Sequence, residues 1–167
     1  MQVRIIYEQR NNQSGDDVMI VDRSFIQFNR ESTDRMREMA AGLTDEQLVL
    51  PVGEHWTVAI VYAHLAFLDQ RALYVLNATE HAGRVINPDF DIFINDVALP
   101  LWAVIPPREA VRLGIESAEA VDKKLEAYPP DLLELIHAEY KRYIFRAYHR
   151  NEHLDDAKAA LKSSGIS

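Results

Sequence analysis

The chain has 167 residues, 48% of them hydrophobic, which suits a single domain with one core and excludes wholesale disorder. Its 18 lysine and arginine residues against 26 acidic ones give a formal net charge of −8. These cations are scattered along the chain, so we expect no nucleic-acid partner. The sequence contains no cysteine, which excludes disulfides, thiolate metal sites and cysteine nucleophiles.

The sequence indicates a soluble, cytoplasmic protein. The longest mostly apolar run, residues 58–68, is 11 residues long, whereas a membrane-spanning helix takes roughly 20. The first 17 residues lack the apolar core and the small-residue cleavage site of a secretory signal. We therefore expect no membrane partner.

The N-terminal part divides into two segments. Residues 1–21 predict an arm or a small hairpin, because short apolar runs flank a cluster of turn-forming residues at 11–15. From residue 22 to 167 the pattern is typical of helices. Apolar residues at three- and four-residue steps predict a first helix over 23–41, with Gly42 as its stop.

The second long helix carries the first unusual feature. Residues 44–47 have the form of a capping box and predict a short turn, which Pro51 and Gly53 interrupt. Thr57 is then a good N-cap for a very apolar helix that Gly83 closes. His64 lies midway along the apolar stripe of this helix, where a histidine is unusual.

Two further long helices follow a long crossover. Residues 84–106 contain several prolines and many apolar residues, which predicts an ordered crossover packed on the other helices. A third helix runs from Pro107 to near Tyr128, with Gly114 as a possible kink. After Pro129 a fourth helical face continues, or breaks briefly, before residues 149–161. Four long helices with one long crossover predict an all-α four-helix bundle.

The histidines provide the candidate metal ligands. His149 and His153 are four residues apart, which places both rings on one face of a helix, and His64 can supply a third nitrogen from a facing helix. The alternative is that His64 is a hydrogen-bonded core residue and that the pair has arisen by chance. His55 precedes the second helix, where it could line the rim of a pocket. The other two histidines, His81 and His137, are expected at the surface or at helix ends.

Residues 149–153 also match the H-x-x-E-H pattern of inverted zinc peptidases. In that reading Glu152 is the general base, and a carboxylate much further along the chain completes the site. Only 14 residues follow His153, which is too few for that further helix. A peptidase is therefore disfavoured.

Several short motifs together resemble the DinB/YfiT-like superfamily. They are LTDEQL at 43–48, PVGEHWTV at 51–58, HLA at 64–66, and a terminal histidine pair followed by Leu154. The resemblance covers roughly residues 23–163, while residues 1–21 and 84–106 lie outside the common pattern. It implies a four-helix bundle that binds a divalent ion, nickel or zinc, through His64, His149 and His153. It also implies that Trp56 packs where the second helix begins.

The resemblance further implies an enzyme acting on a small molecule. Three imidazoles leave at least one coordination position open, as in catalytic metal sites. The better-understood relatives resemble S-transferases and isomerases that use a low-molecular-weight thiol, and others resemble metal-dependent hydrolases. Arg71 could bind a carboxylate of such a thiol, although a surface salt bridge is the simpler interpretation. The apolar content also makes a homodimer plausible.

The rival interpretation is a non-enzymatic helical bundle, a stress or interaction protein. In that case the histidines are buried structural residues or an adventitious metal site.

Overall fold

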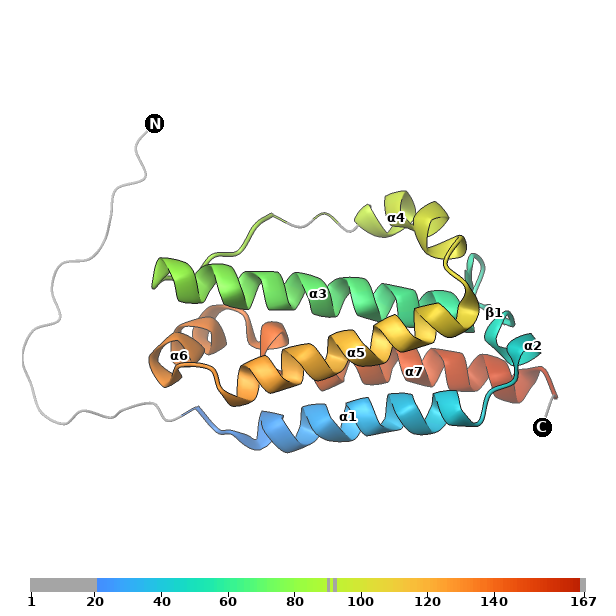
Figure 1. Ribbon diagram of the computed structural model, residues 1–167, viewed down its shortest axis with the longest axis horizontal. Helices are drawn as coiled ribbons and strands as arrows, with labels where there is room; N and C mark the ends of the chain where they lie inside the picture. The colour runs from blue at the N-terminus through green and yellow to red at the C-terminus, as the bar shows by residue number, and fades with distance from the viewer. Residues whose placement is uncertain (1–20, 90, 92, 166–167) are drawn as a thin grey trace, which may run out of the picture.

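The computed structural model describes residues 21–89, 91 and 93–165 of the chain. Four long helices lie side by side along the molecule, with α1 and α7 running in one direction and α3 and α5 in the other (Figure 1). The predicted all-α four-helix bundle is confirmed. The arm or hairpin expected at 1–21 falls, except for its last residue, outside the described residues. The long helices are α1 (Ser24–Ala41), α3 (Val58–Ala82), α5 (Pro107–Glu126) and α7 (Arg146–Ser163).

Shorter elements connect the long helices. Two of them form a small antiparallel hairpin in which Pro51 lies opposite Thr57 and Val52 lies opposite Trp56. The sequence predicted no strands here, since each strand has only two residues, too few for an alternating pattern. The shorter elements are α2 (Asp45–Leu48), β1 (Pro51–Val52), β2 (Trp56–Thr57), α4 (Ile94–Ala103), α6 (Pro130–Glu139) and the 3-10 helix η1 (Lys141–Tyr143).

Local signals set the ends of α2 and α3 as predicted. The Thr44 hydroxyl accepts from the Gln47 amide at 3.2 Å, and the Gln47 side chain accepts from the Thr44 amide at 2.9 Å, which completes the capping box. At the start of α3 the Thr57 hydroxyl accepts from the Ile60 amide. At its end Gly83 has φ 64°, the left-handed conformation that glycine adopts without strain.

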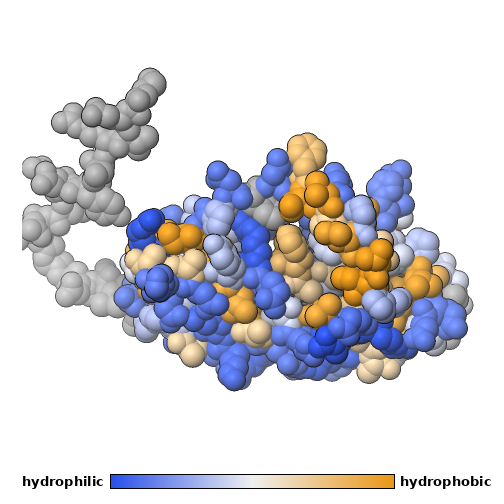
Figure 2. Space-filling view, turned by 45° about the horizontal axis from the view of Figure 1, so that its top comes forward, coloured by the Kyte–Doolittle hydropathy of each residue, from blue (hydrophilic) through white to orange (hydrophobic). Residues whose placement is uncertain are grey.

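The crossover between α3 and α5 is ordered and contains α4, as Figure 1 shows. Trp102 on the inner side of α4 is buried. The expectation that all apolar residues of the crossover are covered is wrong. Only one side of α4 meets the bundle, and apolar residues also lie on its other side. Figure 2 shows apolar side chains gathered over this region. The exposed ones are Phe93, Val97, Leu101 and Val104. The predicted homodimer stays a prediction.

The kink expected at Gly114 is absent, since α5 is one continuous helix. Gly114 instead allows α5 to approach α3 closely. A Cβ atom at this position would lie 3.0 Å from both Cδ1 and the carbonyl oxygen of Tyr62. The absence of a side chain at Gly114 therefore allows α5 to pack closely against α3, and it does not interrupt α5.

The last helical stretch breaks, which was one of the two predicted outcomes. α6 ends at Glu139, η1 follows, and α7 begins at Arg146. Because of this break, the side chains that α7 directs to the bundle interior do not have to follow the helical period of α6. Among the described residues, none of the helices is both long and apolar enough to cross a membrane.

Candidate metal centre

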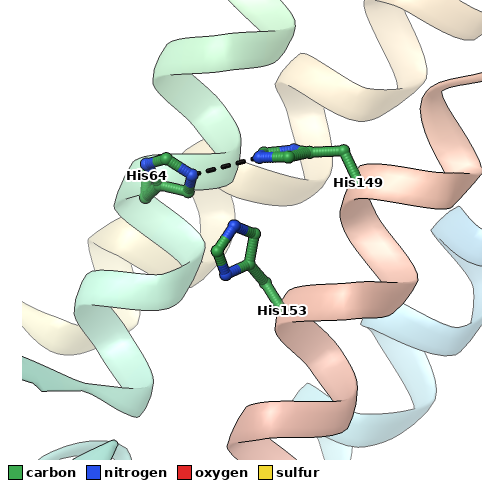
Figure 3. Close-up of side chains that lie close together, drawn as sticks. All are labelled: His64, His149 and His153. Carbon is green, nitrogen blue, oxygen red and sulfur yellow. Dashed lines mark hydrogen bonds between the residues drawn. The ribbon is translucent and has the colours of Figure 1, made fainter. Parts of the chain in front are cut away.

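The structure brings the three predicted histidines together in the bundle interior. His64 projects from α3, and His149 and His153 project from α7 toward it (Figure 3). The Nε2 atoms of His64 and His149 are 3.2 Å apart. One nitrogen from each of the three rings lies within 4.8 Å of the other two. We call these residues the histidine cluster.

Aromatic side chains enclose the histidine cluster on the side of the hairpin. Trp56 on β2 stacks on His153 with ring centroids 5.4 Å apart and lies 4.7 Å from the ring of His64. Trp102, which α4 supplies, meets His64 edge-on at 5.3 Å. The crossover thus contributes directly to the wall of the site. These rings exclude water from one side of the cluster and fix the imidazole planes.

The three rings are neutral at pH 7. Burial lowers the pKa of His64 to about 3, and a charge on His153 or Arg146 would add to this effect. Burial lowers the pKa of His149 to about 2, with Arg146 as the next cause. Burial also lowers the pKa of His153, against the opposing effect of Glu152 and Asp156. A histidine must be neutral to bind a metal ion, so the environment prepares all three for that role.

The geometry fits a divalent metal ion. Two nitrogens bound to one zinc ion at 2.0–2.1 Å in tetrahedral geometry are about 3.3 Å apart. The observed 3.2 Å between the His64 and His149 Nε2 atoms agrees with this separation. The Nδ1 atom of His153 lies 4.0 Å from the Asp156 carboxylate, which is beyond hydrogen-bond distance.

Unpartnered polar atoms also gather at this site. Within the described residues, the buried side-chain atoms without a hydrogen-bond partner include Nδ1 of His64, Nδ1 of His149 and Nη2 of Arg146. Each such atom costs roughly 1–3 kcal/mol. Folded proteins retain few of them, and those that remain call for an explanation such as a functional site.

A buried charge cluster on α3, α5 and α7 lies next to the histidine cluster and reaches α1 through Thr33. Asp69 on α3 accepts from Nε of Arg146 at 2.8 Å and from Nε of Arg150 at 2.9 Å. Arg150 also donates from both terminal nitrogens to Asp122 on α5, at 3.0 Å each. Thr33 on α1 donates to Asp122 at 2.7 Å. The charge cluster, Arg146, Arg150, Asp69 and Asp122, therefore joins all four long helices.

The charge cluster fixes the rotation of α7. Arg150 is fully buried, and burial opposes its charge, but the carboxylates of Asp69 and Asp122 outweigh this effect and raise its pKa. Arg146 and Arg150 alternate with His149 and His153 at three- and four-residue steps, so they share one face of α7. Holding the two arginines against Asp69 consequently turns the two histidines toward His64.

The charge cluster was not predicted from the sequence, because charged side chains usually lie in solvent. A signal was present, since Arg146 and Arg150 have the same helical period as the predicted ligands, and Asp69 interrupts the most apolar helix of the chain.

A groove with a volume of about 590 Å³ opens to the surface beside His153. The hairpin forms one wall through Val52 and Trp56, and α7 forms the other through His153 and Ala160. His55 lines the rim, as predicted. Of the three histidines, His153 is the one that contacts this groove, and its side chain is 20% exposed.

Arg71 lies away from the histidine cluster. Seven residues, about 10 Å of helix, separate it from His64 along α3. Its guanidinium donates to the hydroxyl of Tyr143 and, at 3.0 Å, to the carbonyl of Pro88. These bonds tie the segment after α3 to η1. The assignment of Arg71 to a thiol carboxylate stays a prediction.

The fold and the site define a DinB/YfiT-like helical bundle with a histidine cluster that can hold a metal ion. Residues 29–137, which are 109 of the 167 residues, match the mycothiol maleylpyruvate isomerase N-terminal domain family, and the chain belongs to this family. No curated protein and no solved structure matches the chain. The family match includes His64, whereas His149 and His153 follow it, so geometry alone joins them to the site.

Proposed function

We propose that the protein is a divalent-metal-dependent enzyme that uses a low-molecular-weight thiol to transform a small-molecule substrate. His64, His149 and His153 hold the ion, with zinc or nickel as the preferred metals. The observation that carries the proposal is the meeting of three neutral imidazoles, one buried and two half-buried, within 4.8 Å of one another. The family description, which refers to a mycothiol-dependent isomerase, supports the thiol.

The donor set determines what the site can do. Imidazole is a typical ligand of zinc and nickel, and three neutral ligands leave the full charge of the ion uncompensated. A divalent ion in this position supplies Lewis acidity that deprotonates a coordinated thiol at neutral pH. The aromatic rings of Trp56 and Trp102 keep water away from the buried side of the site.

We favour thiol chemistry over hydrolysis. The side chains that meet within 4.8 Å of one another are, in the part of the chain that the structure describes, histidines alone, so no carboxylate is grouped with them as a base. The side chain of Glu152, the candidate base, is exposed to solvent. Asp155 pairs with Arg35 at 2.5 Å on the surface. A metal-bound thiol and a metal-bound water would both release a proton to solvent, so the preference for the thiol rests on the family description.

Metal analysis of protein purified without a histidine tag tests the proposal. We expect one zinc or nickel ion per chain after incubation with the metal and removal of the excess. Replacing His149 with alanine is expected to abolish retention of the ion, because two imidazoles hold a metal much less tightly than three. His81→Ala is the matched control, since His81 is exposed at the end of α3.

Two results would reject the proposal. One is a correctly folded wild-type protein that retains no ion. The other is a His149→Ala protein that retains as much ion as the His81→Ala control. Either result would favour the non-enzymatic helical bundle with buried structural histidines.

A further inference from the structure

The groove beside His153 has a distribution of charge and apolar surface that selects among ligands. Its inner end reaches His153, and its middle is formed by the half-buried side chains of Val52, Trp56 and Ala160. At the rim, Glu54 and Asp156 present carboxylates that are 86% and 64% exposed.

The two ends of the groove favour opposite charges. Three neutral imidazoles leave a divalent ion with its full positive charge, so the inner end favours an anionic donor atom. The rim carries two carboxylates and one imidazole, His55, whose Nε2 lies 3.8 Å from the Glu54 carboxylate, and the described residues of the lining include no lysine or arginine. The rim therefore favours a cation and disfavours a second anion.

We infer that this groove binds small thiols that carry a positive charge away from the sulfur, with the sulfur directed to the histidine cluster and the cation to Glu54 and Asp156. The inference rests on the proposed function, because the ion provides the inner attachment. It adds the class of ligand, an aminothiol, and the path by which that ligand enters. The apolar middle of the groove contacts the carbon chain between the two charged ends.

Cobalt-loaded protein gives a direct measurement of thiol binding. Co²⁺ occupies zinc sites and absorbs visible light, and a coordinated thiolate adds a charge-transfer band that can be titrated. The probes are cysteamine, 2-mercaptoethanol and 3-mercaptopropionate, which are cationic, neutral and anionic. Because the chain has no cysteine, these thiols form no mixed disulfides with the protein.

The first pair of variants tests the charge at the rim. Glu54→Gln is expected to weaken cysteamine binding roughly two- to five-fold and to strengthen 3-mercaptopropionate binding by a similar factor, while 2-mercaptoethanol binding stays the same. The affinity for each probe is compared between wild type and variant, so differences in pKa among the three thiols do not affect the result. Glu134→Gln is the control of equal charge change, because α6 lies at the other end of the bundle (Figure 1).

The second pair tests the path. Ala159 lines the groove and is exposed, so Ala159→Trp is expected to obstruct it and to weaken all three thiols roughly ten-fold, with the affinity for Co²⁺ unchanged. Lys158→Trp places the same side chain at an exposed neighbouring position outside the groove and is expected to have little effect.

The outcomes separate this inference from the proposed function. Wild-type protein that takes up no Co²⁺ overturns both. Protein that takes up Co²⁺ but shows the same thiol affinities in Glu54→Gln as in Glu134→Gln overturns the aminothiol selectivity. Equal thiol affinities in the two tryptophan variants overturn the groove as the path.

Discussion

The histidine cluster and the charge cluster lie beside each other between α3 and α7, and they are built in opposite ways. In the charge cluster, Asp69 accepts from both arginines and Asp122 accepts from Arg150, so that every guanidinium nitrogen of Arg150 is paired, while Nη2 of Arg146 has no partner within the described residues. In the histidine cluster, the buried Nδ1 atoms of His64 and His149 have no partner among the described residues.

The difference separates a group that holds the fold from a group that is prepared for a ligand. Buried charges are tolerated when each one is paired, and such pairs then specify how the helices meet. Buried polar atoms that stay unpaired lower stability and persist where function requires them. The charge cluster thus provides the rigid support on which the Nε2 atoms of His64 and His149 are held 3.2 Å apart, a separation that suits two ligands of one ion.

The largest effect is expected from removing the shared carboxylate of the charge cluster. Asp69→Ala leaves Arg146 and Arg150 without their common partner, and both are buried, so we expect a loss of about 3–5 kcal/mol in the free energy of unfolding. Urea denaturation measures this loss. A loss below about 1 kcal/mol would mean that the charge cluster does not hold the helices together.

Acid is expected to destabilise the metal-free protein through the histidine cluster. The folded-state pKa values of His64 and His149 lie below the ordinary value of about 6.5, so between about pH 3 and pH 6.5 the unfolded chain binds more protons. The free energy of unfolding therefore falls as the pH drops, by about 2 kcal/mol for each of the two rings from pH 7 to pH 5.

Replacing one histidine shows how much of this loss in the free energy of unfolding comes from its ring. In His149→Leu, we expect the loss between pH 7 and pH 5 to be about 2 kcal/mol smaller than in wild type, as urea denaturation at the two pH values would show. An equal loss in both proteins would show that His149 is not held neutral in the folded state.

Zinc is expected to stabilise the protein through the histidine cluster alone. At a free zinc concentration one hundred times the dissociation constant, binding to the folded state adds about 2.7 kcal/mol to the free energy of unfolding. The gain should appear as a rise in the midpoint of thermal unfolding, reverse on chelation and be absent in His149→Leu. A similar gain in that variant would place the ion elsewhere.

The smallest effect is expected at an exposed ion pair that joins two of the same helices. Arg37 on α1 contacts Glu119 on α5 at 2.6 Å, and both side chains are nearly half exposed. Because solvent screens such pairs, we expect Arg37→Ala to cost less than about 1 kcal/mol in urea denaturation. A loss as large as that of Asp69→Ala would remove the distinction between buried and exposed pairs.

Local signals made most of the fold predictable from the sequence. Thr57 and Gly83 define the ends of α3 because capping depends on one residue and its near neighbours. The histidine cluster was predictable because a spacing of four residues fixes the relative placement of His149 and His153 on any helix. The contact between these two residues and His64 required the bundle and the family resemblance.

The features that the sequence did not reveal depend on contacts between distant segments. Gly114 indicates a kink by itself, and its role in packing appears only when Tyr62 is placed against it. Arg150 looks like a solvated charge until Asp69 and Asp122, far away in sequence, are found around it. The exposed side of α4 likewise could not be anticipated, because helical period does not tell which apolar side chains a bundle leaves uncovered.

X-ray absorption spectroscopy at the zinc edge of the loaded protein tests the central claim most directly. We expect three imidazole nitrogens around the zinc ion at about 2.0–2.1 Å in wild type, and loss of this three-imidazole shell in His64→Ala to which zinc has been added. A first coordination sphere with fewer than three imidazoles in wild type, or a spectrum that His64→Ala leaves unchanged, would contradict this claim.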